Sequence, residues 1–133
     1  MTLLKDILAT DPDLHVSFLP IQGQADMGGG LIWRAADDRN YYLARANPLE
    51  QNIRVYRVVN GVRHLPHNFD QTIDVRQWHI LRVTHQGCHG NIFYDDKQVF
   101  DLCDKTFRAG MIGLWTRSDT VTYVDDLQLQ HVE

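Results

Sequence analysis

GGGLIWRAADDRNYYLARANPLEQN, residues Gly28 to Asn52, is the stretch that decides the fold. Two apolar and aromatic segments within it, Leu31–Arg34 and Tyr41–Ala46, have the composition of strands, and the polar turn Ala36–Asn40 separates them. A second polar corner, Asn47–Asn52, leads into the next strand. The three glycines at the start lack the lysine and hydroxyl residue of a phosphate-binding loop. They predict a close backbone approach or a bulge at a strand entry.

Turn signals follow one another through the rest of the chain at intervals of roughly 8–12 residues. Asn60-Gly61 is the strongest hairpin signal, and Asp95-Asp96 predicts another tight hairpin. Residues Thr2–Ala9 fit either a short helix or a strand that pairs with the C-terminus. The remaining predicted strands are His15–Leu19, Asn52–Val59, Val62–Leu65, Trp78–His85, Asn91–Tyr94, Lys97–Leu102, Gly110–Thr116 and Thr120–Leu129, with a polar loop at Pro66–Val75. The absence of alternating helices predicts one all-β domain over residues 1–133, an antiparallel sandwich or barrel.

Composition excludes several classes of partner. Apolar residues make up 44% of the chain and charged residues 23%, as in an ordinary globular domain. The net charge of -4 argues against a nucleic acid or an anionic membrane as partner. Arginines far outnumber lysines, and a guanidinium can stack on aromatic rings and donate two parallel hydrogen bonds. This bias favours recognition of a polar ligand or ion pairing.

The N-terminal segment and the cysteines predict a cytoplasmic protein for the chain as it stands. Lys5 and Asp6 interrupt the first apolar run, and no small-residue cleavage site follows it, so a signal peptide is not expected. No apolar stretch approaches the roughly 20 residues that span a bilayer. The two cysteines, Cys88 and Cys103, do not form a disulfide framework, and we expect free thiols.

Four patterns together resemble a known superfamily. They are GGLIWRAADDRNYYLARANPLEQNIRVYRVVNG at Gly29–Gly61, QWHILRV at Gln77–Val83, YDDKQVFD at Tyr94–Asp101, and FRAGMIGLWTRSDTVTYVDDLQL at Phe107–Leu129. In order and spacing they resemble the concanavalin A-like lectin/glucanase superfamily, and in particular laminin-G-like bacterial domains described as 3-keto-disaccharide hydrolase or as domains of unknown function. The resemblance implies a jelly-roll sandwich, and relatives of this kind are often exported.

The chain departs from this resemblance in two respects. Relatives usually carry several tens of further residues before the strand at His15–Leu19, so the chain resembles an N-terminally shortened member. The glucanases' catalytic signature, two glutamates flanking an aspartate on one strand, is absent. Glu50 and Glu133 are the glutamates of the chain and lie far apart in the sequence. A hydrolase of this family would have to pair Glu50 with an aspartate, because glycoside hydrolysis needs two carboxyl groups.

Strand phase predicts a ligand-binding sheet face. Side chains alternate along strands, so Tyr41 and Arg45 share one face, and Arg54 and Tyr56 share the corresponding face of the next strand. If the two strands pair antiparallel, Arg45 lies near Asn52 or Arg54, and Tyr41 lies near Tyr56. Aromatic rings stack on the apolar faces of sugars, and guanidinium groups bind hydroxyl pairs. The competing interpretation is that the rings are core and the arginines are solvated. The predicted ligand-binding residues are Arg34, Tyr41, Arg45, Arg54, Tyr56 and Trp115.

The corner around Pro48 admits two interpretations. Asn47 and Asn52 are typical turn residues, so the corner can be purely structural. Alternatively Glu50, oriented by Arg45, acts as a general base or ligand acceptor, since a nearby arginine lowers the pKa of a carboxyl group. We favour the structural interpretation.

Metal and cofactor sites are weakly indicated. Aspartates are unfavourable inside strands, so Asp125 and Asp126 are candidates for an ion pair or a Ca²⁺ site. His85, Cys88 and His89 fit no common zinc spacing and lie at a predicted hairpin turn. We therefore expect no cofactor.

Three functions are consistent with the sequence. The leading one is a non-catalytic, lectin-like carbohydrate-binding module. The others are a glycoside-processing hydrolase that uses Glu50 and an aspartate, and an oligomeric interaction protein. If the N-terminal strand of the relatives is missing, the strand at Thr120–Leu129 is left as an exposed edge. We expect it to be covered by Met1–Ala9 or by a second copy in a homodimer. The predicted core positions include Trp33, Trp78, Phe93, Leu114 and Val124.

Overall fold

Eleven strands make up the described part of the chain. The computed structural model describes residues 1–22, 29–116 and 121–131, with side chains except at 21, 22, 65, 66, 116, 121–126, 130 and 131. The strands are β1 (Thr2–Ala9), β2 (Pro12–Gln22), β3 (Gly29–Asp37), β4 (Asn40–Asn47), β5 (Asn52–Val59), β6 (Val62–Asp70), β7 (His79–Gln86), β8 (His89–Tyr94), β9 (Lys97–Cys103), β10 (Gly110–Thr116) and β11 (Val121–His131).

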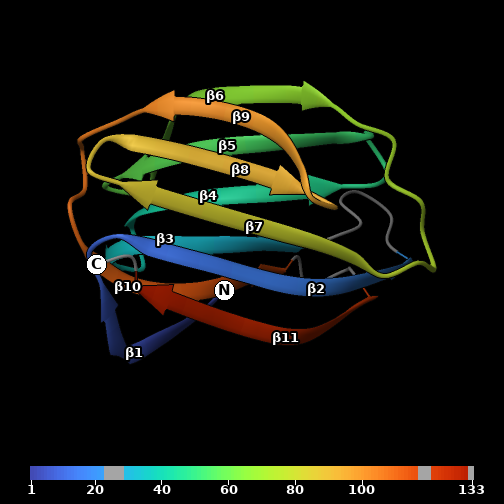
Figure 1. Ribbon diagram of the computed structural model, residues 1–133, viewed down its shortest axis with the longest axis horizontal. Helices are drawn as coiled ribbons and strands as arrows, with labels where there is room; N and C mark the ends of the chain where they lie inside the picture. Colours follow the sequence, from blue (N-terminus) through green and yellow to red (C-terminus); the bar gives the residue numbers. More distant parts are fainter. Residues whose placement is uncertain (23–28, 117–120, 132–133) are drawn as a thin grey trace.

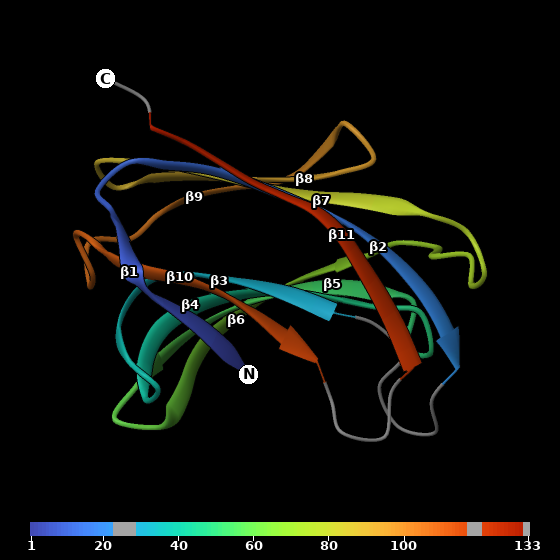
Figure 2. The same cartoon turned by 90° about the horizontal axis from the view of Figure 1, so that it is seen from below.

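The strands form two antiparallel sheets that pack face to face (Figures 1 and 2). One sheet has six strands in the order β1-β10-β3-β4-β5-β6, and the other has five in the order β11-β2-β7-β8-β9. This arrangement is a jelly-roll β-sandwich, and it confirms the predicted fold class. In Figure 2 the two layers are seen edge-on, with β7, β8 and β9 above β4, β5 and β6.

Apolar side chains from both sheets fill the space between the layers. Leu14, Val16 and Phe18 of β2 and Leu81 and Val83 of β7 alternate inward, and each of them is buried. The six-stranded sheet contributes Leu31, Trp33, Tyr42, Ala44, Ala46, Ile53 and Val55. Trp33 is fully buried, as predicted, and Leu114 is partly buried against this core. Phe93 was predicted to be core, but it is half-buried opposite Arg82, because its neighbours Ile92 and Tyr94 take the inward positions of β8. The side chain of Val124 lies outside the described residues.

The two predicted hairpin turns are confirmed by their backbone angles. Asn60 and Gly61 have φ values of 51° and 81°, and Asp95 and Asp96 have φ values of 46° and 67°. Two consecutive positive φ values are required by the tight turns whose twist matches that of antiparallel strands. Asn, Asp and Gly tolerate this conformation at the lowest cost.

Two predicted elements differ in the structure. Thr2–Ala9 is a strand, but it pairs with β10 rather than with the C-terminal strand. It therefore does not cover β11, which pairs with β2 at the edge of the other sheet. The predicted loop Pro66–Val75 is also wrong in its first half, since β6 continues to Asp70. Pro66 is accommodated because β6 is an edge strand whose register with β5 shifts there.

Trp78 was predicted to be core and is 51% exposed. The reason is the phase of β7, in which His79 points inward. Its ring nitrogens contact the Asp95 carboxylate at 2.8 Å and the carbonyl oxygen of Asp74 at 2.6 Å. Alternation along the strand then places Trp78 on the solvent side.

The prediction of free thiols is wrong, because Cys88 and Cys103 form a disulfide. Pairing of β8 with β9 places His89 opposite Cys103, which brings the adjacent Cys88 into reach. The two Cα atoms are 4.7 Å apart, within the range that a disulfide spans. Only the register of the hairpin reveals this proximity.

Removing the disulfide should destabilise the domain moderately. The bond closes a loop between residues 15 positions apart, and loss of that constraint on the unfolded chain costs about 2–3 kcal/mol. Urea denaturation of the C88S/C103S variant measures this loss. A reductant should lower the stability of the parent protein by a similar amount and leave the variant unchanged. Equal sensitivity of both proteins to the reductant would contradict the bond.

Candidate functional site

One cross-strand row organises the outer face of the six-stranded sheet, the face turned away from the core. Trp115 of β10 lies opposite Gly30 of β3, Gly30 lies opposite Arg45 of β4, Arg45 lies opposite Arg54 of β5, and Arg54 lies opposite Asn68 of β6. Directly opposed residues on neighbouring strands have adjacent side chains. The predicted proximity of Arg45 and Arg54 is confirmed.

Gly30 is the residue of this row that has no side chain. A Cβ atom at this position would lie 2.6 Å from the carbonyl oxygen of Ala44 and 2.8 Å from Cδ1 of Leu43. The predicted close backbone approach is therefore confirmed. Since Gly30 has no side chain, the Arg45 guanidinium can reach across β3, and its Cζ lies 5.6 Å from the centre of the Trp115 ring.

The outer face has an apolar floor. Its buried members are Ile32, Ala35, Leu43, Tyr56 and Val58, all from β3, β4 and β5. Side chains from the six-stranded sheet alone pack around them: Leu3, Tyr41, Met111 and Trp115. A sheet face that only meets water is usually polar, so a second apolar cluster distinguishes this face from an ordinary solvated one.

Arginines and aromatic rings lie over this floor. The Cζ atom of Arg45 is 5.5 Å from the centre of the Tyr56 ring, and that of Arg63 is 4.9 Å from the same ring. Such distances allow cation–π attraction. The Tyr56 hydroxyl oxygen accepts hydrogen bonds from Nη2 of Arg45 at 3.3 Å and from Nη1 of Arg54 at 3.4 Å. No described group accepts the proton of the Tyr56 hydroxyl, so it can donate to a ligand.

Tyr41 belongs to the same face but lies to one side. It is opposite Val58, while Tyr56 is opposite Leu43, so Tyr41 is a diagonal neighbour of Tyr56. Burial raises the pKa of the Tyr41 phenol, and the partly buried ring packs on the apolar floor. Its role on this face is therefore mainly packing.

The corner between β4 and β5 is held by Asn47. The Asn47 side-chain oxygen accepts hydrogen bonds from the backbone N–H groups of Leu49 at 3.0 Å and Glu50 at 3.2 Å. Gln51 completes the turn with a φ of 55°. This is an Asx-type turn, which agrees with the structural interpretation of the corner.

Glu50 lies at the rim of the face, where its side chain is 44% exposed. Its Oε2 is 3.7 Å from Nη2 of Arg54 and accepts a hydrogen bond from the Asn52 amide at 3.4 Å. Asn52 itself is 5% exposed, and its Oδ1 has no hydrogen-bond partner among the described residues. This oxygen is closed to solvent, so the acceptor stays unsatisfied within the corner.

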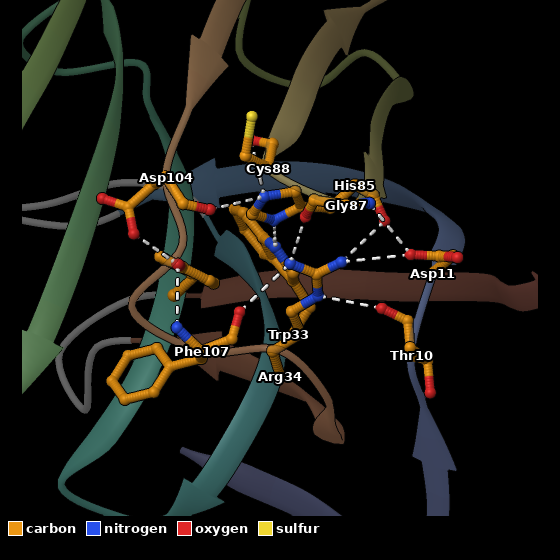
Figure 3. Close-up of polar contacts among 10 residues, drawn as sticks. Thr10, Asp11, Trp33, Arg34, His85, Gly87, Cys88, Asp104 and Phe107 are labelled. Carbon is orange, nitrogen blue, oxygen red and sulfur yellow. Dashed lines mark hydrogen bonds and ion pairs between the residues drawn. The ribbon is translucent and has the colours of Figure 1, made fainter.

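Arg34 was predicted to belong to this face, and the structure places it elsewhere. It has a positive φ of 49°, and the register of β3 with both neighbours shifts around it. This β-bulge breaks the alternation on which the prediction relied. The side chain is 1% exposed and lies at one end of the sandwich, where three connections between strands meet (Figure 3).

Every donor of the Arg34 guanidinium is occupied. The five hydrogen bonds, 2.9–3.3 Å long, go to the carbonyl oxygens of Thr10, His85, Gly87 and Phe107 and to Oδ1 of Asp11. Since a guanidinium has five N–H groups, none remains for a ligand. Arg34 therefore holds together three loops, those between β1 and β2, between β7 and β8, and between β9 and β10. Its role is structural.

His85 lies beside this cluster as a neutral imidazole. Its Nδ1 accepts a hydrogen bond from the Trp33 indole at 3.0 Å. Its Nε2 faces the carbonyl oxygens of Cys88 at 3.1 Å and Asp104 at 3.2 Å, so it carries the proton (Figure 3). Burial, together with the charge of Arg34, lowers the pKa of His85 to about 4.

A second network fixes the segment after β9. The Tyr42 hydroxyl donates to Oδ1 of Asp104, and Arg57 Nη1 donates to Oδ2 of the same carboxylate at 2.9 Å. Burial and the hydrogen bond to Asp104 raise the pKa of Tyr42 to about 12. Burial opposes ionisation of Asp104, but its hydrogen bonds from Tyr42 and Thr106 and the charge of Arg57 keep its pKa below the ordinary value.

Metal binding finds little support in the described residues. Within 1–22, 29–116 and 121–131, no group of three or more His, Cys, Asp or Glu side chains is arranged to hold a metal ion. Cys88 is in a disulfide, and His85 is engaged on both ring nitrogens. The side chains of Asp125 and Asp126, the predicted Ca²⁺ candidates, lie outside the described residues.

The outer face also contains residues that were not predicted. Arg63 lies opposite Val58, and Asn68, opposite Arg54, accepts a hydrogen bond from Arg54 Nε at 3.0 Å. The Asn60-Gly61 turn fixes the pairing of β5 with β6 next to it, so this turn could have placed Arg63 on the face. Asn68 could not be placed in this way, because the bulge near Pro66 changes the register beyond it.

The fold is that of known lectin-like domains. The carbohydrate-binding module CBM66 from Bacillus subtilis superposes with a TM-score of 0.84 at 23% identity, covering 93% of this chain and 77% of the module. Galectin LEC-6 of Caenorhabditis elegans has a TM-score of 0.72 at 14% identity, covering 98% and 89%. Chicken galectin 2 has a TM-score of 0.77 at 5% identity, covering 98% of both chains. At these identities the likeness establishes the jelly-roll fold.

One curated protein is similar in sequence to part of this chain. The levanase of Bacillus subtilis (strain 168) is 28% identical over 93 residues, which are 69% of this chain. The match spans 14% of the enzyme's length, so it concerns a small part of that protein. No protein-family model matches the chain. Among the described residues, no helix has the length and apolar character that crossing a membrane requires.

Proposed function

We propose that the chain is a non-catalytic carbohydrate-binding module whose ligand surface is the outer face of the six-stranded sheet. The observation that carries this proposal is the apolar floor of Ile32, Leu43 and Val58 beneath a layer of aromatic and guanidinium groups. A sugar offers apolar C–H faces to rings and hydroxyl pairs to planar donors, so this layer matches both of its surfaces. The likeness to a carbohydrate-binding module and galectins supports the same class of ligand.

The polar groups that would select the ligand lie along the row. Arg54 has a partly exposed side chain, Glu50 is an exposed acceptor at the rim, and no described group accepts the proton of the Tyr56 hydroxyl. Donors and an acceptor placed around one apolar patch fix both the position and the orientation of a hydroxylated ring. Trp115 supplies the aromatic surface at the other end of the row.

Catalysis by Glu50 finds less support. The contacts of its carboxylate are with Arg54 and Asn52, as expected of a ligand acceptor or a rim ion pair. Glycoside hydrolysis needs a second carboxyl group at a defined separation, and none of these contacts supplies one. We therefore assign Glu50 to ligand binding.

Substitutions on the outer face of the six-stranded sheet should weaken saccharide binding, and substitutions elsewhere should not. Calorimetric titration with levan, the polysaccharide after which the levanase relative is named, and with a panel of mono- and disaccharides identifies the ligand. Arg54→Gln and Tyr56→Phe should each weaken binding about tenfold, because each removes a hydrogen bond involving a charged or polar group in a partly buried site. Arg76→Gln, an exposed change outside the row, is the matched control. Unchanged affinity in both row variants would refute this surface.

The apolar floor also favours a second candidate, an interface with another copy of the chain. The side chains that pack on this floor, Leu3, Tyr41, Met111 and Trp115, are only partly buried, and covering their remaining apolar surface drives association as readily as it binds a ligand. Light scattering at micromolar concentration separates the two cases. A dimer that Trp115→Ser converts to a monomer, together with no response to any saccharide, would favour the interface. Pairing through the edge of β11, the other predicted route to a homodimer, should instead be insensitive to Trp115→Ser.

A further inference from the structure

A cleft at the Arg34 end of the sandwich is not used by the proposed function. It has a volume of about 550 Å³, which is within the range of small-molecule sites. Arg34, Asp11 and Phe107 form part of its wall, and Lys105 and Arg108 also line it. Figure 3 shows the buried part of this wall, with Asp11 and Phe107 on either side of Arg34.

The charges around the cleft are unbalanced. The Asp11 carboxylate is engaged by Arg34 and by the backbone N–H of Gly87. Lys105 and Arg108 have no ion pair in the described part of the chain, so the lining carries three cations and one carboxylate. The whole chain has a net charge of -4, so this local excess of positive charge opposes the overall balance. A cleft lined by charge of one sign concentrates ligands of the opposite sign.

The segment that carries both cations is anchored at several points. The Asp104 backbone N–H donates to the Cys88 carbonyl at 2.9 Å, and the Cys88–Cys103 disulfide lies immediately beside it. The Phe107 backbone N–H donates to the Tyr42 hydroxyl at 3.1 Å, and its carbonyl accepts from Arg34 at 3.1 Å. Lys105 and Arg108 therefore project from a backbone that is fixed before any ligand arrives, which reduces the entropy cost of binding.

We propose that this cleft is a second binding site, for the anionic group of an acidic saccharide. Lys105 and Arg108 bind the carboxylate or sulfate of the sugar through charge-assisted hydrogen bonds. Arg34 contributes its positive charge to the site but no hydrogen bond, because its donors are all occupied. The choice of a saccharide as carrier of the anion rests on the proposed function. The preference for an anion rests on the cleft alone.

The test compares acidic and neutral sugars by calorimetry or NMR titration at low salt. Galacturonate should bind at least about tenfold more tightly than galactose, which corresponds to one charge-assisted contact. Galactose 6-sulfate shows whether the cleft prefers a sulfate to a carboxylate. The preference should disappear in the K105Q/R108Q variant and weaken in 0.5 M NaCl, because partly exposed charges are screened.

The matched control is K5Q/R76Q, which removes the same charge from exposed positions outside the cleft. It should keep the preference for galacturonate, whereas an equal loss in both double variants would overturn the site. Acetate that binds as tightly as galacturonate would overturn the assignment to a saccharide. The Tyr56→Phe variant should bind galacturonate normally, so failure of the outer-face proposal remains distinguishable from failure of this one.

Discussion

Replacing Arg34 with alanine is expected to lower the free energy of unfolding by about 4 kcal/mol, a large share of the roughly 5–15 kcal/mol that stabilises an ordinary domain. The change deletes five hydrogen bonds at once and leaves four carbonyl oxygens and the Asp11 carboxylate without that partner. Buried acceptors that lose their donors bear the full desolvation cost. Urea denaturation followed by tryptophan fluorescence measures the effect.

Arg34→Lys gives a graded version of this experiment in a chain that should still fold. Lysine keeps the charge but concentrates its three donors at one point, so it cannot reach the three separate connections. We expect a loss of about 2 kcal/mol. The control is Arg39→Ala, which removes an exposed guanidinium bound to one carbonyl oxygen, that of Asn60, and should cost less than about 1 kcal/mol. Similar losses for Arg34→Lys and Arg39→Ala would contradict the structural role of Arg34.

Acidification should destabilise the domain through His85. In the unfolded chain its imidazole takes up a proton below about pH 6.5, whereas in the folded protein its pKa is lowered to about 4. Between these values the unfolded state binds more protons, so the free energy of unfolding falls as the pH falls. The full contribution is about 3 kcal/mol, present above pH 6.5 and lost by pH 4.

The pH effect has a structural signature and a clear control. Protonation of Nδ1 of His85 would set two donors against each other, because the Trp33 indole N–H already donates to that atom. Trp33 emission should therefore change in the same pH window. His85→Gln should flatten the pH dependence of unfolding between pH 6.5 and 4, while His89→Gln, at an exposed position, should not. Equal slopes in the parent and in His85→Gln would contradict this assignment.

The fold could be predicted because its signals are local. Alternating apolar residues and the turn pairs Asn60-Gly61 and Asp95-Asp96 determine strand positions within a few residues of the chain. The phase of β4 and β5 also follows from local alternation, which is why Arg45 and Arg54 were placed side by side correctly. The prediction for Trp78 was wrong because Trp78 and His79 are neighbours and only one of them can point inward. Tryptophan is the more hydrophobic residue, but His79 takes the buried position.

Features that depend on contacts across the sandwich could not be predicted. The bulge at Arg34 has no glycine or proline to indicate it, and the residue with the positive φ is held by hydrogen bonds to distant carbonyl groups and to Asp11. The disulfide follows from the register of β8 with β9, and composition alone favoured free thiols. The cleft beside Phe107 is built from three connections that are distant in sequence. Predicting such sites requires the topology of the strands as well as the sequence pattern.

The hydrogen bonds of Arg34 can stabilise the protein only late in folding. Its hydrogen bonds join residues 23 to 73 positions apart, so none can form until the strands of both sheets have met. Interactions that form after the rate-limiting step leave the folding rate unchanged and slow unfolding. If the whole contribution of about 4 kcal/mol acts on that step, the native lifetime lengthens on the order of a thousandfold. In that case Arg34 lengthens the time for which a folded molecule persists, and with it the resistance to proteases that capture opened chains.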